Sequence, residues 1–181
     1  RDSKIFENIW VQPAAGDAGG SLGAALAVWH QYLGKPKANF EARDRMQGSY
    51  LGPAYCNQEI RKCLESKEAV FEEVSNETLY DRVAASIDQG KIVAWFSGRM
   101  EFGPRALGAR SILGDPRNPD LQKLMNLKIK NRESFRPFAP AIKSERVGDW
   151  FAAEEESPYM LFVTQVSPPK RLAETQEQAA L

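Results

Sequence analysis

The sequence has only one histidine, two cysteines and no excess of charge of either sign. Its 24 lysine and arginine residues balance 24 aspartate and glutamate residues, so the formal net charge at pH 7 is zero. A neutral chain has no general attraction to nucleic acid or to acidic membranes, and any positive site has to be local. His30 by itself provides neither a His–His metal site nor, without help, a His–Asp relay, and we expect it at a helix surface or edge.

Cys56 and Cys63 lie seven positions apart, a spacing that fits neither a zinc pair nor a disulfide framework, and we expect both to be reduced and partly buried. The sequence has no run of eighteen apolar residues and no leader-like start, which predicts no membrane span, no export signal and a cytoplasmic location. With 181 residues and 43% hydrophobic content, the chain is long enough for one core, or one core and part of a second.

The apolar pattern predicts two unequal pieces joined by a linker. Residues 9–11 are a candidate strand, followed by a glycine turn and a helix that is capped by Ser21 and ended by Gly34. The rhythm is lost over residues 35–53, where Pro, Gly, Arg and Asp predominate. We therefore predict a remnant domain at 1–34, a linker at 35–53 and a main domain at 54–181.

The main domain is predicted to mix helices and strands, which gives an α/β (α+β) class. Helices are expected at 57–66, from a Thr78–Asp81 capping box to Gly90, after Asn118 at an N-cap before proline, and in "ERVGDWF". Strands are expected at 69–74, in "KIVAWF" and in "YMLFVTQV". The polar residues after 167 are expected to be loosely held.

The stretch "SGRMEFGPRALGARSILGDPR" (residues 97–117) carries the strongest functional signal. Between residues 98 and 136, nine lysines and arginines face four acids, a local excess of five positive charges. Guanidinium forks bind phosphate or carboxylate oxygens in pairs, and glycines let backbone N–H groups approach the same anion. Gly103–Pro104 is also a candidate helix start. The stretch matches neither a Walker loop nor G-x-G-x-x-G. It predicts a polyanion pocket, and the alternative is an exposed face with surface ion pairs.

The later stretch "KIKNRESFRPFAP" adds further cations and two aromatic rings. If this chain is extended, alternation places Lys128, Lys130 and Arg132 on one face. Phe135 and Phe138 are candidates for stacking an adenine, although core packing is the preferred interpretation.

The two stretches "GRMEFGPRALGARSILGDPR" and "NLKIKNRESFRPFAPAI" resemble the carbamoyltransferases of the NodU/CmcH type over residues 50–166. The resemblance implies a C-terminal domain with a YrdC/Sua5-like fold, a twisted mixed sheet with flanking helices, that joins ATP and carbamoyl phosphate into carbamoyl adenylate. It further implies a preceding actin/Hsp70-type, Kae1-like domain with an Fe²⁺ site, which passes the carbamoyl group to a hydroxyl acceptor.

The stretch "QPAAGDAGGSLGAAL" resembles the last nucleotide-side segment of that Kae1-like domain, a remnant strand-turn-helix, with Asp17 at the position of a metal-ligand aspartate. The histidines that complete the metal site in the family precede this segment and are absent here. For Asp17 a simple helix-start role is therefore preferred. The resemblance implies a C-terminal piece of a longer protein, truncated at its end, that does not complete the transfer reaction alone.

Carried over residue by residue, the resemblance implies that Lys130 and Arg132 grip the triphosphate, while Arg105 and Arg110 face the carbamoyl and phosphate groups as catalytic residues. The remaining implied cofactor-binding residues are Ser111, Arg99, Lys128 and Arg136. Mg²⁺ is expected on the phosphates. The acidic residues Glu101, Asp115 and Glu133 are candidates for holding it or for orienting arginines, and we prefer the second role for Glu101.

The implied partners are ATP, carbamoyl phosphate, the chain's own Kae1-like domain and a hydroxylated small-molecule acceptor, with neither a membrane nor nucleic acid expected. Two alternatives stay open. In the first, the chain is a YrdC-like nucleotide- or RNA-binding module without turnover. In the second, it is a structural domain that only docks on its partner domain. Salt dependence separates a nucleic-acid binder from an ATP pocket.

Overall fold

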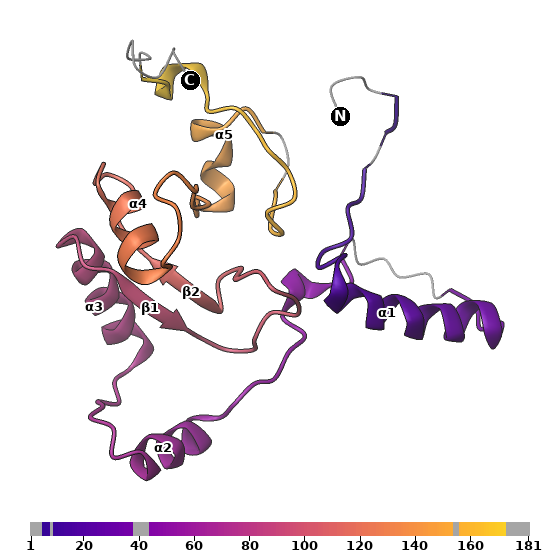
Figure 1. Cartoon of the computed structure of the whole chain (residues 1–181), viewed down its shortest axis with the longest axis horizontal. Helices are drawn as coiled ribbons and strands as arrows, with labels where there is room; N and C mark the ends of the chain where they lie inside the picture. Colours follow the sequence, from indigo (N-terminus) through magenta and orange to yellow (C-terminus); the bar gives the residue numbers. More distant parts are fainter. Residues whose placement is uncertain (1–4, 8, 38–43, 154–155, 173–181) are drawn as a thin grey trace. The chain divides into compact units, whose positions relative to one another are not determined.

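The computed structural model describes residues 5–7, 9–37, 44–153 and 156–172 of the chain (Figure 1). The chain divides into two compact units, Arg1–Pro137 and Phe138–Leu181. The described residues form five α-helices, several short 3₁₀ and π turns, and one sheet of two antiparallel strands. The predicted mixed α/β class is confirmed. The YrdC-like sheet, the actin-type remnant and the predicted domain boundaries remain predictions.

The first helix, α1 (Asp17–Ala27), begins earlier than its predicted cap. Gly16 is the N-cap, and the Ser21 hydroxyl instead donates back to the Ala18 carbonyl at 2.9 Å. A π turn (Val28–Tyr32) continues α1, and Gly34 at a φ of +60° ends the helical run, as predicted. The strand expected at residues 9–11 is absent; these residues have no regular structure.

Two further helices precede the sheet. The helix α2 (Asn57–Ser66) lies where the sequence predicts it. The helix α3 (Asn76–Asp88) begins after Ser75, whose Oγ accepts from the Thr78 N–H at 3.2 Å, so the predicted cap at Thr78 is wrong by three residues. Gly90 follows at a φ of +78°. The strand expected at 69–74 is also wrong, because this stretch has no regular structure.

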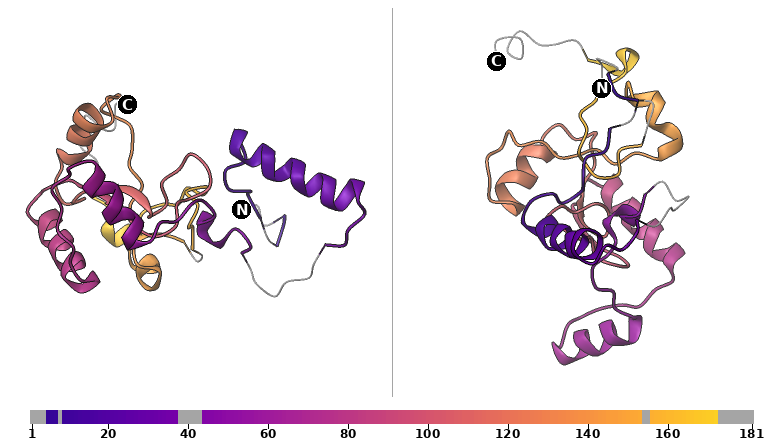
Figure 2. Two further views of the ribbon diagram at one scale, coloured as in Figure 1. Left: turned by 90° about the horizontal axis from the view of Figure 1, so that it is seen from below. Right: turned by 90° about the vertical axis from the view of Figure 1, so that its right-hand side faces the viewer.

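The sheet consists of β1 (Val93–Phe96), the predicted "KIVAWF" strand, and β2 (Arg110–Leu113). Their antiparallel register pairs Val93 with Leu113 and Phe96 with Arg110. The helix α3 contacts β1, and the rings of Tyr80 and Trp95 lie 6.2 Å apart. Figure 2 shows the same elements in two further views. The hairpin therefore has one face supported by α3.

After β2 the chain enters α4 (Leu121–Leu124), which a π turn (Met125–Ile129) extends. The N-cap is Asp120 rather than the predicted Asn118, whose Oδ1 instead accepts from the Asp120 N–H at 3.0 Å. Leu121 and Met125 are buried, and Gly114 allows their approach. A Cβ at Gly114 would lie 2.5 Å from Leu121 Cδ2.

The second unit contains a 3₁₀ turn (Ser144–Arg146) followed by α5 (Val147–Trp150), the brief helix predicted in "ERVGDWF". The strand predicted in "YMLFVTQV" is wrong: only one isolated bridge forms there, between Phe151 and Val166. The Lys170 Nζ lies 4.6 Å from the ring centre of Trp150.

Few apolar side chains are buried among the described residues: Met46, Ala109, Leu121, Met125 and Tyr159. Cys56 and Cys63 are both exposed, so the expectation of partial burial is wrong. His30 is half-buried at the end of the α1 run, as expected, with Nδ1 2.8 Å from the Lys35 carbonyl oxygen. None of the described helices combines the length and the apolar character needed to cross a membrane.

Candidate functional site

The arginine loop, defined here as residues 97–109, connects β1 to β2. It is closed at its base by a hydrogen bond from the Ser97 N–H to the Ala109 carbonyl at 2.9 Å. The helix predicted to start at Gly103–Pro104 is absent, because Gly103 has a φ of +100° and the chain continues through bends into β2. Any anion bound here is therefore held by side chains and loop N–H groups, and no helix N-terminus contributes.

Glu101 organises this loop from the inside. Its carboxylate is screened from solvent, and Oε1 accepts from the N–H groups of Leu107 and Ala109, both at 2.7 Å. Oε2 accepts from Nε of Arg110 at 2.8 Å, and Nη2 of Arg110 donates to the carbonyls of Glu101 and Gly103, each at 3.2 Å. One ion pair with a buried carboxylate thus fixes the loop and the first residue of β2.

The charge of Glu101 is strongly favoured in this setting. Burial by itself raises the pKa of the carboxyl, but the hydrogen bonds from Arg110 and from the Leu107 and Ala109 N–H groups outweigh it and lower the pKa to about 2. A carboxylate that accepts several N–H groups is a poor proton carrier at neutral pH. Glu101 is therefore a structural anion, which confirms the preferred arginine-orienting role.

The other two acidic candidates are also engaged with arginines. Asp115 accepts from the Arg117 guanidinium, with an ion-pair distance of 2.7 Å, and these bonds lower the pKa of Asp115. Glu133 pairs with Arg136 at 2.8 Å. All three carboxylates form ion pairs with arginine side chains in this structure. In each of them at least one carboxylate oxygen is engaged by an arginine, so none offers a free oxygen pair to Mg²⁺.

A second buried polar residue, Asn126, organises the turn after α4. The side chain is fully buried, and its Nδ2 donates to the carbonyls of Ser134 and Arg136 at 3.0 and 2.8 Å. Its Oδ1 accepts from Nε of Arg132 at 2.6 Å. The amide therefore folds residues 126–136 into a tight turn and sets the position of the Arg132 guanidinium.

This turn corrects the prediction of one extended cationic face. Lys128 lies inside the π turn, Lys130 caps its end, and Asn131 follows with a φ of +47°. The helical period that starts at Leu121 simply continues, and Asn126 then reverses the chain. Phe135 is 77% exposed, so its expected core packing is wrong, whereas Phe138 is half-buried.

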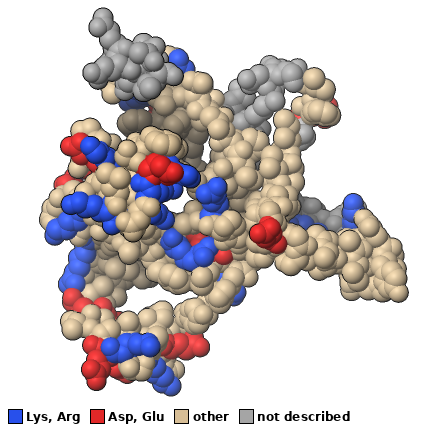
Figure 3. Space-filling model, viewed as in Figure 1, with Lys and Arg blue, Asp and Glu red and all other residues tan. Residues whose placement is uncertain are grey.

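The predicted site residues fall into two groups. The hairpin carries Arg99, Arg105, Arg110 and Ser111; the turn after α4 carries Lys128, Lys130, Arg132 and Arg136. Arg99 donates to the Gly52 carbonyl at 2.6 Å, and Ser111 is half-buried opposite Trp95. In Figure 3 lysine and arginine side chains gather over α4, β2 and the loop beside them.

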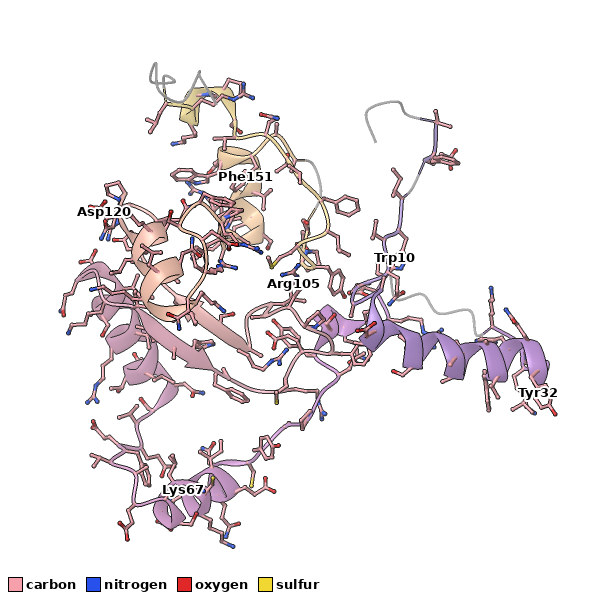
Figure 4. All side chains as sticks on the ribbon, viewed as in Figure 1. Trp10, Tyr32, Lys67, Arg105, Asp120 and Phe151 are labelled. Carbon is pink, nitrogen blue, oxygen red and sulfur yellow. The ribbon has the colours of Figure 1, made fainter. Side chains whose placement is uncertain are left out.

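Three of these cations have a side chain without an ion pair or hydrogen bond to any described residue: Arg105, Lys128 and Lys130, all exposed. Arg105 lies on the arginine loop, as Figure 4 shows. They are the cations that remain available to an anion. Sequence reasoning missed Tyr50 and Asn126, which hold these segments, and a single tyrosine or asparagine gives no signal in one sequence.

Asp17 is the first residue of α1, directly after Gly16. This position matches the simple helix-start role. Within the described ranges no three His, Cys, Asp or Glu side chains gather as metal ligands. The described residues alone therefore do not supply a ligand set for Fe²⁺, and the metal role of Asp17 stays a prediction.

The fold and the site define a mixed α/β domain with a cation-rich hairpin loop and turn, each held by a buried polar side chain. Residues 84–178 match the family model described as Carbamoyltransferase C-terminus. The chain therefore belongs to this carbamoyltransferase family, and the resemblance to the NodU/CmcH type is confirmed.

Three relatives illustrate the match. An uncharacterized protein of Synechocystis sp. is 56% identical over 178 residues, which cover 97% of this chain and 29% of that protein. The nodulation protein NolO of Bradyrhizobium diazoefficiens is 38% identical over 172 residues, which cover 93% of this chain and 30% of that protein. The 3'-hydroxymethylcephem-O-carbamoyltransferase of Amycolatopsis lactamdurans is 30% identical over 161 residues, which cover 89% of this chain and 28% of that protein. The chain thus spans less than a third of the length of these relatives.

Proposed function

We propose that this chain is the C-terminal part of an O-carbamoyltransferase and that its arginine loop and α4 turn bind ATP and carbamoyl phosphate to form carbamoyl adenylate. The observation that carries the proposal is the set of three exposed, unpaired cations, Arg105, Lys128 and Lys130, on backbone that Glu101 and Asn126 hold rigidly. Cations on a preorganised backbone stabilise phosphate charge at little reorganisation cost.

The chemistry suits such a site because adenylation needs no protein nucleophile. Pyrophosphate leaves the α-phosphorus of ATP as a carbamate oxygen attacks it, and carbamoyl phosphate supplies that carbamate by reacting with water and releasing phosphate. Positioning and charge stabilisation are then the main tasks of the protein. We assign the carbamoyl and phosphate groups to Arg105 and Arg110, and the triphosphate to Lys130 and Arg132.

The other residues have supporting roles in this proposal. Arg110 already uses Nε and Nη2 on the loop, so it contributes charge from a fixed position, while Arg105 is the adjustable fork. Ser111 offers a hydroxyl, and Arg99, Lys128 and Arg136 add positive potential. Phe135, a residue that is 77% exposed, offers its ring as a surface for the adenine. Transfer to a hydroxyl acceptor and the Fe²⁺ site belong, in this proposal, to a longer protein.

A second candidate is a nucleotide- or RNA-binding module without turnover. The excess of five positive charges between residues 98 and 136 favours it, because such a segment attracts any phosphate chain. Calorimetric titration with Mg–ATP and with single-stranded RNA, at low and high salt, separates the two. The ATP site predicts selective binding of ATP, whereas an RNA-binding surface predicts tighter RNA binding with a steep log–log salt dependence.

A further inference from the structure

The segment before α2 hydrogen-bonds along the arginine loop. Residues 46–53, here called the clasp segment, were predicted to be part of a linker. Their hydrogen bonds follow the first half of the loop in order. Arg99 Nη1 donates to the Gly52 carbonyl at 2.6 Å. The Gly52 N–H donates to the Met100 carbonyl and the Met100 N–H to the Pro53 carbonyl, both at 2.9 Å, and the Phe102 N–H donates to the Ser49 carbonyl at 2.6 Å. The clasp segment thus borders the loop from Arg99 to Phe102.

Tyr50 reaches from the clasp segment to the second half of the loop. Its Oη donates to the Leu107 carbonyl at 2.8 Å. Gly108, at a φ of +125°, makes room for this contact, because a Cβ there would lie 2.9 Å from the Tyr50 Oη. The tyrosine hydroxyl and the bare backbone of Gly108 therefore fit together as a pair.

The backbone that aims Tyr50 is unusual. Gln47, Gly48 and Ser49 have φ values of +49°, +69° and +65°, a run that L-residues rarely adopt. It is held by hydrogen bonds from Ser49 N to Met46 O at 2.7 Å and from Tyr50 N to Gln47 O at 3.3 Å, and both Met46 and Ser49 are buried. Strained backbone persists where the surroundings hold it in place.

The tip of the loop depends on these contacts. Within the described residues, Arg105 has no hydrogen bond of its own, so its place is set by its neighbours on either side. On one side, Arg110 Nη2 donates to the Gly103 carbonyl. On the other side, the Leu107 N–H donates to Glu101 Oε1, and the Leu107 carbonyl accepts from Tyr50 Oη. The Tyr50 bond is the only one of these that comes from outside the hairpin.

We propose that Tyr50 is a positioning residue of the carbamoyl adenylate site and acts through the Leu107 carbonyl to hold Arg105 in place. This inference rests on the proposed function. A guanidinium displaced by about an ångström stabilises the reacting phosphate less, and such displacements lower catalytic rates steeply. Lys130 lies at the end of the turn after α4, and its side chain has no partner among the described residues. Loss of the Tyr50 hydroxyl is therefore expected to affect turnover more than ATP affinity.

The test compares Tyr50→Phe with Tyr55→Phe, since Tyr55 is exposed and has no hydrogen bond with any described residue. Each variant loses one hydroxyl. We expect Tyr50→Phe to lower the kcat of pyrophosphate release about fivefold, the effect of one hydrogen bond, with a smaller change in the KM for ATP. Amide hydrogen exchange at residues 103–108 should also become faster. Tyr55→Phe should change neither.

A double-mutant cycle distinguishes positioning from a general structural effect. In an Arg105→Lys background, Tyr50→Phe should have little further effect on kcat, because the group that it positions is already altered. Equal kcat and equal exchange in the two tyrosine variants, or a full additive loss in the double variant, would overturn the inference. If the unaltered chain releases no pyrophosphate, the proposed function fails. If amide exchange at residues 103–108 is also unchanged in Tyr50→Phe, the Tyr50 contact does not determine the conformation of the loop.

Discussion

The Nε of Arg110 lies 2.8 Å from Oε2 of Glu101, within the hairpin that carries Arg99 and Arg105. The carboxylate of this pair is inaccessible to solvent, while the arginine side chain remains 29% exposed. The pair links the buried Glu101 carboxylate to a guanidinium at the surface of the loop. Several positive charges held close together repel one another, so a buried carboxylate that binds the loop backbone offsets this repulsion.

The Glu101 ion pair predicts a specific acid sensitivity. The pKa of Glu101 is lowered to about 2 in the folded chain, so its contribution is fully present above the unfolded pKa near 4.5 and is lost as the pH falls through about 2. The shift corresponds to about 3 kcal/mol of the free energy of unfolding. Urea unfolding from pH 6 to pH 2 should show this loss in the unaltered chain and a shallower loss in Glu101→Gln.

The control for that experiment is Glu65→Gln on α2, where the carboxylate is exposed and has no partner among the described residues. Its acid profile should follow that of the unaltered chain. Identical pH profiles in the Glu101 and Glu65 variants would contradict the account of Glu101 as a structural anion of the loop.

Asn126 predicts a stability effect of a different kind. Asn126→Ala removes the hydrogen bonds of the amide to the carbonyls of Ser134 and Arg136 and to the Arg132 Nε, although Gln122 Nε2 still donates to the Arg136 carbonyl at 3.1 Å. We expect a loss of about 3 kcal/mol in the free energy of unfolding. Asn126→Asp should be at least as harmful, because a carboxylate oxygen would then face two carbonyls. Chemical denaturation measures both, with the exposed Asn57→Ala as control. A loss no larger than that of the control would show that the turn does not depend on the amide.

Lys130 predicts an effect on binding without an effect on folding. Because its ammonium has no partner among the described residues, Lys130→Ala should leave the unfolding curve unchanged. It should weaken ATP binding by about 1.5–3 kcal/mol, the range for hydrogen bonds to charged groups. Lys67→Ala removes the same charge beyond the C-terminal end of α2, far from Arg105 in Figure 4, and should leave binding unchanged. Equal affinities in the two variants would remove Lys130 from the site.

The sequence predicts those elements that local patterns determine. The periodic apolar residues and Gly90 mark α3 near its observed end, and the run "KIVAWF" marks β1. The stretches at 69–74 and "YMLFVTQV" also carry several apolar residues but form no strand. Strand formation needs a pairing partner, and a single sequence does not show which segments pair.

Some features of the candidate site could be predicted from the sequence, and others could not. The cation-rich stretch and the arginine-orienting role of Glu101 are visible in the sequence, since fixed positive charges need nearby carboxylates. The tight turn at Asn126 and the Tyr50 contact are not visible there. Both depend on one side chain that meets carbonyls 8 to 57 positions away along the chain, a relation that only the fold creates.

The central claim is most directly tested by incubating this chain with Mg–ATP and carbamoyl phosphate, and measuring pyrophosphate release together with mass spectrometry of the nucleotide product. We predict pyrophosphate that depends on both substrates and a carbamoyl adenylate peak, both strongly reduced in Arg105→Lys because an ammonium lacks the planar fork. Adding an aminoglycoside should give no carbamoylated acceptor. ATP binding without pyrophosphate release at any carbamoyl phosphate concentration would contradict the account, and a carbamoylated acceptor would show that the transfer step is wrongly placed outside this chain.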